Sequence, residues 1–199
     1  MRRLAFFISG TGGNAHNLLA ACRDRKVEAL PVIAVSSSTT APGVERLRAE
    51  GLSVKIVTRS SHASDEEFSN ACFSLCEAEA VDIICLCGFL KKLVLPDHWM
   101  RRVINIHPGP LPRFGGAGMY GRAVHEAVLA SGTTKSGPTV HLVDNEYDHG
   151  KKLAFAPVPV APDDTPETLQ ERVYMAEMKL YPKALQLFLN NYPISEDQL

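Results

Sequence analysis

Short apolar runs alternate with amphipathic stretches along the first half of the chain. The amphipathic stretches predict helices over residues 14–25 and 42–51, and a third that begins after Ser64, with Glu67 at the capping-box position. Alternating strands and helices predict an α/β fold with a mostly parallel central sheet and helices on both of its faces. The apolar runs, which we interpret as the buried strands of that sheet, are Leu4–Ser9, Leu30–Val35, Val54–Val57, Val81–Cys87 and Val103–His107.

The pattern changes after His107. Prolines and glycines crowd residues 108–121 and predict a long irregular loop. Beyond this loop the periodicity predicts a helix, two strands and a last helix that continues past a proline. Their expected ranges are residues 120–131, 138–143, 153–160 and 166–189.

Length and charge limit the classes of function. The chain has 199 residues and a net charge of −1, enough for one α/β domain with its own core. Acidic and basic residues are mixed along it, whereas a protein that binds nucleic acid usually carries a basic segment. No apolar stretch approaches the ~20 residues that span a bilayer, and the run after Arg3 is too short for a signal peptide. We therefore expect a cytoplasmic protein without nucleic-acid or membrane partners.

The chain has five cysteines, at positions 22, 72, 76, 85 and 87. An odd number without a secretory signal favours reduced thiols. Their spacing lacks the paired pattern of a zinc site. We interpret them as small buried apolar side chains and expect no metal.

A glycine-rich turn, Ser9–Ala15, lies between the first predicted strand and helix. It formally matches the dinucleotide fingerprint, but that fingerprint also needs an acidic residue at the end of the second strand, where this chain has Ser36-Ser37-Ser38. A tight turn without a ligand is one alternative. Backbone N–H groups at a helix start favour anions, so a single phosphate is the better interpretation.

Asn105 and His107 lie two residues apart on a predicted strand, so both side chains project from the same face. They stand at its carboxyl end, where open α/β sheets bind ligands. An amide donor beside an imidazole suits the stabilisation of an oxyanion and a nearby proton transfer. A purely structural histidine is the alternative.

The acidic stretch 144–150 is a second candidate. It lacks the spacing and flanking helices of a calcium-binding loop, so a solvated turn is the simplest interpretation of Asp144 and Glu146. Asp148, next to a His-Gly turn, could instead pair with His107. For His141, a core histidine is favoured over a catalytic one. His16, His98 and His125 receive the same structural interpretation from their amphipathic contexts.

Several of these segments together resemble the phosphoribosylglycinamide formyltransferases, folate-dependent enzymes of purine biosynthesis. The resemblance runs in family order over nearly the whole chain. It rests on residues 8–14, Cys87-Gly88-Phe89-Leu90, Ile104-Asn105-Ile106-His107-Pro108, Leu111-Pro112, 115–121 and 137–150. It implies a Rossmann-like formyltransferase fold with an antiparallel C-terminal extension. Residues 1–199 would form a single domain, with a phosphate-binding half (1–100) and a catalytic and folate-binding half (101–199).

The resemblance also implies roles for individual residues. The formyl donor would be 10-formyltetrahydrofolate, the acceptor 5'-phosphoribosylglycinamide, and the protein a monomer or homodimer. Asn105 and protonated His107 would stabilise the tetrahedral oxyanion, while Asp148 would raise the His107 pKa and assist proton transfer. The substrate phosphate would lie on Gly12, Gly13 and Asn14 and its ribose on Glu177. The folate would contact Leu90, Lys91, Lys92, Leu93, Asn105 and Asp144.

This chain departs from the family at three places. Gly109-Pro110 replaces the usual Ser-Leu, Asp65 stands where a basic folate contact is usual, and Lys151-Lys152 replaces apolar residues. The resemblance further implies a cis peptide bond at Leu111–Pro112.

Rival functions share parts of the same site. A formyltransferase acting on initiator methionyl-tRNA would normally carry an extra basic C-terminal domain, and a formyl-folate hydrolase an extra N-terminal one. A non-catalytic phosphate-binding module would need none of Asn105, His107 and Asp148.

Overall fold

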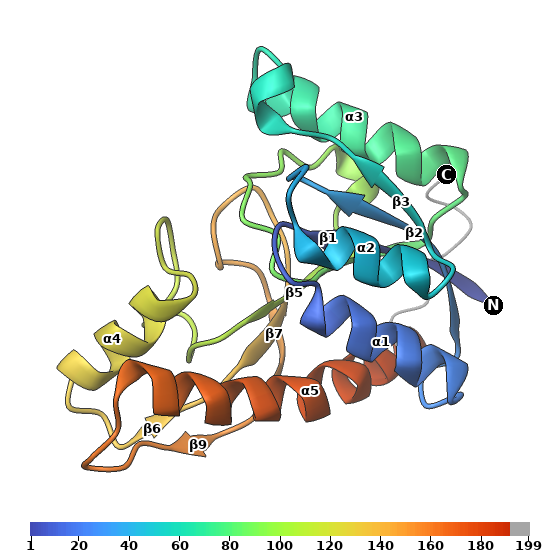
Figure 1. Cartoon of the computed structure of the whole chain (residues 1–199). Helices are drawn as coiled ribbons and strands as arrows, with labels where there is room; N and C mark the ends of the chain where they lie inside the picture. Colours follow the sequence, from blue (N-terminus) through green and yellow to red (C-terminus); the bar gives the residue numbers. More distant parts are fainter. Residues whose placement is uncertain (192–199) are drawn as a thin grey trace.

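The computed structural model describes residues Met1–Asn191, which form a seven-stranded mixed sheet (Figure 1). Five neighbouring strands are parallel, the sixth is antiparallel to them, and the last is antiparallel to the sixth. The predicted mostly parallel sheet with an antiparallel extension is thus confirmed. In sheet order the strands are β3 (Ser53–Ile56), β2 (Ala29–Ser36), β1 (Arg2–Ile8), β4 (Ile83–Leu86), β5 (Val103–His107), β7 (Thr139–Leu142) and β8 (Lys152–Phe155).

Helices cover both faces of this sheet, as predicted. Leu4, Phe6 and Ile8 of β1 pack with one set of helices, whereas Ala5 and Phe7 point to the opposite face. The first face carries α1 (Gly13–Arg23), α2 (Pro42–Ala49) and α5 (Pro166–Asn191), and the second carries α3 (Asp65–Ala78). Strict alternation of buried side chains along β1 therefore supplies both layers of the core.

One chain segment differs from the predicted elements. Residues 153–160 form two short strands, β8 and β9 (Val158–Pro159), instead of one. Pro157 between them has no N–H to donate to a ladder, which ends the first strand there. β9 pairs with β6 (Lys135–Ser136) in a separate two-stranded sheet. Near these strands, α4 (Arg122–Ala130) packs against the first half of α5.

Side-chain hydrogen bonds cap α3 and join α5 to the sheet. The Ser64 hydroxyl accepts the Glu67 N–H at 3.1 Å, so the predicted cap of α3 is confirmed. The fully buried Tyr181 hydroxyl of α5 reaches the carbonyls of Leu86 and Ile104 at 3.0 and 3.2 Å, which ties the last helix to β4 and β5.

Two short turns and one cis peptide bond lie outside the helices and strands of the sheet layers. Two short 3₁₀ turns, η1 (Arg59–Ser61) and η2 (Asp97–Trp99), were not expected from the sequence. The Leu111–Pro112 peptide is cis, as predicted.

The described cysteines are free thiols, and burial raises the pKa of Cys72 to about 12. Among residues 1–191, no helix has the length and apolar composition needed to cross a bilayer.

Candidate active site

The carboxyl ends of β4 and β5 border a cavity of about 300 Å³. Most side chains that the sequence singled out line it, although they come from five separate segments. Gly12 and Gly13 are not among the lining residues. The predicted site residues that do line it are Asn14, Leu90, Lys91, Lys92, Leu93, Asn105, His107, Asp144, Asp148 and Glu177.

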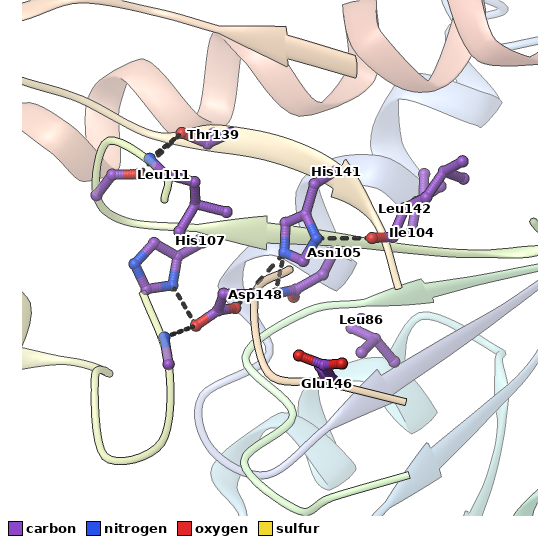
Figure 2. A network of polar contacts seen from close by, with 12 residues as sticks. Leu86, Ile104, Asn105, His107, Leu111, Thr139, His141, Leu142, Glu146 and Asp148 are labelled. Atoms are coloured by element: carbon purple, nitrogen blue, oxygen red, sulfur yellow. Dashed lines mark hydrogen bonds and ion pairs between the residues drawn. The ribbon is translucent and has the colours of Figure 1, made fainter. Parts of the chain in front are cut away.

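His107 lies at the last position of β5, where its imidazole is 3% exposed. Its Nε2 donates to the Phe114 carbonyl at 2.7 Å, and its Nδ1 lies 3.4 Å from Asp148 Oδ2 (Figure 2). The predicted pairing of Asp148 with His107 is therefore observed. Both ring nitrogens face acceptors, so the surroundings offer partners to the protonated ring.

The pKa of His107 is nevertheless lower than that of an ordinary histidine. Burial penalises the imidazolium most strongly, and this outweighs the nearby Asp148 carboxylate and the Phe114 carbonyl, which both favour it. Asp148 thus acts in the predicted direction. The expectation that His107 would have a raised pKa overall is wrong, because the sequence did not show how deeply the ring is buried.

Asp148 is the polar centre of the site, and its backbone adopts a left-handed conformation with φ of 54°. Its Oδ2 accepts the Gly116 N–H at 3.0 Å, and its Oδ1 lies 3.5 Å from His141 Nε2. Burial alone would raise the pKa of this carboxyl, but His141, His107 and Gly116 together hold it below its usual range. Asp148 is therefore a carboxylate at neutral pH.

His141 is a site residue that the sequence reasoning missed. It was interpreted as a core histidine, and it is 2% exposed, but its ring points toward the same polar cluster. Its Nδ1 donates to the Leu142 carbonyl at 2.8 Å, and its Nε2 lies 3.1 Å from Asn105 Nδ2. This contact orients the Asn105 carboxamide and leaves its second amide hydrogen available.

The signal for His141 was present but incomplete. Alternation correctly placed it on one face with Thr139 and Val143. Only the pairing of the strands shows that His141 lies directly opposite Asn105. That register depends on the long connection between β5 and β7, which the sequence pattern does not determine.

The opposite end of the site lies at the start of α1. Gly12 caps this helix in a left-handed conformation with φ of 67°. In place of an acidic residue at the end of β2, the Ser37 hydroxyl lies 2.6 Å from that of Ser9. The serine at this position lacks the carboxylate that the dinucleotide fingerprint needs.

Asn14 and Glu177 form a buried pair between α1 and α5. Asn14 Nδ2 donates to Glu177 Oε2 at 2.7 Å, and the buried Asn14 Oδ1 has no hydrogen-bond partner among the described residues. Burial raises the pKa of Glu177 to about 7 despite the Asn14 contact. The pair thus presents a free acceptor and a carboxyl that titrates near neutrality beside the cavity.

Two of the departures from the family pattern have partners in the structure. Asp65 forms an ion pair with Arg59. Lys152 Nζ donates to the Leu111 carbonyl at 3.0 Å and so contacts the loop that follows β5.

The remaining histidines take the surroundings that a structural role implies. His16 and His98 lie near Glu50 and Glu77. His125 is buried on α4, and burial lowers its pKa to about 4. Among residues 1–191, no group of three or more His, Cys, Asp and Glu side chains could hold a metal ion.

The geometry agrees with the comparisons to known proteins. A family described as formyl transferase matches residues 2–185, so the chain belongs to this family. It is similar to the chloroplastic phosphoribosylglycinamide formyltransferase of Arabidopsis thaliana, with 38% identity over 183 residues, which are 90% of this chain and 63% of the relative. It is also 36% identical over 187 residues to the trifunctional purine biosynthetic protein adenosine-3 of Bos taurus, which covers 93% of this chain and 18% of the relative.

The chain thus spans less than two thirds of the length of these two relatives. The solved structures match over most of both chains. Glycinamide ribonucleotide transformylase 1 from Symbiobacterium toebii gives a TM-score of 0.89 at 31% identity, over 96% of this chain and 88% of that one. Phosphoribosylglycinamide formyltransferase from Brucella melitensis gives 0.85 at 36% identity, over 98% of both chains. The resemblance predicted from the sequence is confirmed.

Proposed function

We propose that this protein transfers the formyl group of 10-formyltetrahydrofolate to the amine of 5'-phosphoribosylglycinamide. One observation carries the proposal: Asn105, His107 and Asp148 meet in a cavity that reaches from the 90–93 segment to Asn14 at the start of α1. A formyl donor and a phosphorylated acceptor could therefore meet at the catalytic cluster. Membership of the formyl transferase family supports this reaction class.

The reaction places the oxyanion beside Asn105 and His107. The acceptor amine attacks the formyl carbon, the carbonyl oxygen becomes negative, and the bond from that carbon to the folate nitrogen then breaks. Asn105 donates its second amide hydrogen to the oxyanion, while His141 holds the first. His107 donates after exchanging its bond to the Phe114 carbonyl for one to the oxyanion.

Proton transfer needs a charge partner for His107. The attacking amine loses a proton, and the leaving folate nitrogen gains one. Asp148, ionised at neutral pH, stabilises the imidazolium form of His107 and assists this transfer. The low pKa of His107 makes that contribution necessary, because burial otherwise keeps the ring neutral.

The substrates occupy opposite ends of the cavity. The backbone N–H groups at the start of α1, from Gly12 to Asn14, hold the phosphate. Glu177 and the free Oδ1 of Asn14 bind the ribose hydroxyls. The folate lies between the 90–93 segment and the loop that carries Asp144. No metal is required, and we expect a cytoplasmic monomer or homodimer.

A transfer assay tests the proposal. The protein is mixed with glycinamide ribonucleotide and 10-formyltetrahydrofolate, and formation of deformylated folate is followed. His107→Ala should lower kcat by ~10³ with little change in phosphate-substrate affinity, because the lost contacts form in the transition state. An active protein whose His107→Ala variant keeps substantial activity contradicts the assigned role.

The same assay distinguishes the rival functions by their different results. Formylation of methionyl-tRNA in place of glycinamide ribonucleotide would identify another acceptor. Binding of both small substrates without any transfer would indicate a non-catalytic module. Tight binding of NAD or NADP would overturn the single-phosphate interpretation of the glycine loop.

A further inference from the structure

The 88–95 segment, between β4 and η2, has no helix or strand, yet it forms one wall of the cavity. Backbone N–H groups outside regular structure need other partners. Here three of them are bound by side-chain oxygens from three different parts of the fold. The bonds are Leu90 N to Ser9 Oγ (2.9 Å), Val94 N to Ser69 Oγ (2.9 Å) and Leu95 N to Asn145 Oδ1 (2.7 Å).

Asn145 differs from the two serines because it makes two hydrogen bonds to the same residue. Asn145 Oδ1 accepts the Leu95 N–H, and its Nδ2 donates to the Leu95 carbonyl at 3.4 Å. The carboxamide thus pairs with Leu95 as a backbone peptide of a neighbouring strand would. Leu95 is 3% exposed, so water does not readily replace this partner.

Asn145 also belongs to the opposite wall of the cavity. It lies in the 144–148 loop, three residues before Asp148. An Asp144 turn, in which Oδ1 accepts the Glu146 N–H at 2.9 Å, fixes the backbone around it. One side chain therefore joins the loop that presents the catalytic carboxylate to the 88–95 segment.

We propose that Asn145 is a positioning residue that sets the spacing between these two walls, and so the affinity for the folate donor. The inference rests on the proposed function, which places the pterin between them. A pterin is a flat ring with hydrogen-bond donors and acceptors along its edge. Backbone groups on two segments can bind that edge only while the segments keep their relative position.

The other two anchors explain why Asn145 is the position to test. Ser9 belongs to the glycine loop, so its loss would also disturb the phosphate end. Ser69 is fully buried on α3, where its hydroxyl donates to the Asp65 carbonyl at 2.6 Å and accepts from Val94. Of these three anchors, only Asn145 connects the two walls directly.

The experiment compares Asn145→Ala and Asn145→Asp with the parent. The alanine variant loses both hydrogen bonds, so KM for 10-formyltetrahydrofolate should rise about tenfold, while kcat and KM for glycinamide ribonucleotide stay within about twofold. The aspartate variant keeps the acceptor for the Leu95 N–H, so its KM should lie between the other two. Binding of tetrahydrofolate, measured by calorimetry, should weaken in the same order.

Asn70→Ala is the matched control, because it truncates an exposed asparagine on α3 that faces solvent. It should leave every constant unchanged. Ser69→Ala gives a second measurement if Asn145→Ala does not fold, and it should also raise the folate KM selectively.

The outcomes separate this inference from the proposed function. If the parent neither transfers formyl nor binds tetrahydrofolate, both proposals fail. If the parent is active and Asn145→Ala keeps the parental folate KM, or loses kcat and both affinities together, only the positioning role fails.

Discussion

Asp148 contacts two imidazoles and one backbone N–H, and each contact constrains the others. Its two oxygens lie on His107 and His141, while Gly116 donates from the irregular loop. His107 is buried, so the adjacent carboxylate favours its charged form where water cannot. At the scale of single residues, the site is therefore one coupled network.

Asp148→Asn tests this coupling at constant shape. Loss of the negative charge should lower the already depressed His107 pKa further, so less imidazolium forms at neutral pH. We expect kcat to fall by ~10² and residual activity to shift to lower pH, with phosphate-substrate affinity unchanged. Rate profiles against pH measure this. Asp163→Asn, at an exposed carboxylate, is the control, and an unshifted profile in Asp148→Asn would mean that Asp148 is only a turn residue.

The start of α1 shows what a single element contributes. Gly12 needs a left-handed backbone, and a Cβ there would lie 3.2 Å from the Cα of Gly43 in the neighbouring helix. The element thus combines a steric requirement for glycine with a helix start, the kind of helix end that favours anions.

Gly12→Ala should raise KM for the phosphorylated substrate while the folate KM stays constant. Gly51→Ala is a matched control, since Gly51 has a similar φ of +78° but nothing within 4 Å of its Cβ position. Each variant should lose about 1 kcal/mol of stability from backbone strain, but only Gly12→Ala should lose affinity. Equal KM values in both variants would remove the glycine loop from the phosphate site.

The pairing of α1 with α5 has a consequence for stability against pH. Burial raises the pKa of Glu177 from 4.5 to about 7, so the folded protein binds this proton more tightly than the unfolded chain. Its contribution is fully present below the unfolded value of 4.5 and is lost as pH rises through about 7. That change corresponds to about 3 kcal/mol at most.

Glu177→Gln should therefore change the pH dependence in a defined direction. Relative to the parent, the free energy of unfolding of the variant should increase by up to about 3 kcal/mol between about pH 4 and about pH 8. Urea unfolding at both pH values measures it. A difference between variant and parent that is constant with pH would contradict the raised pKa.

At the scale of the whole molecule, the last helix is joined to the middle of the sheet. Tyr181 is fully buried, and its hydroxyl contacts carbonyls on two adjacent strands, β4 and β5, whose carboxyl ends border the cavity. The same helix carries Glu177 to Asn14. Docking of α5 thus positions part of the cavity lining.

Tyr181→Phe removes the hydroxyl and leaves two buried carbonyls with fewer partners. We expect a loss of about 1–3 kcal/mol in the free energy of unfolding, measured in urea. Tyr120→Phe, which removes an exposed hydroxyl, should change stability little. If Tyr181→Phe is as stable as the parent, hydrophobic packing alone holds α5.

Sequence patterns predicted the strands and helices that have long periodic signals. The apolar run that became β5 was predicted with its observed bounds. The two-residue strand β6 was missed because two residues carry no periodicity, and β9 was not separated from β8. The contact of Asp148 with His107 followed from chemistry. The role of His141 could not be predicted, because it depends on the register of β5 and β7. The lowered pKa of His107 could not be predicted either, because it depends on how deeply the ring is buried.

The pairing of β5 with β7 also determines where related chains can gain or lose residues. Asn105 and His141 are direct partners across two strands. One residue inserted after Thr139 would bring Val140 opposite Asn105 and turn His141 to the other face of the sheet. An insertion in the turn at 131–134, before β6 and β7, leaves that register intact. Length variation among descendants of this protein should therefore accumulate in that turn and be absent from β7.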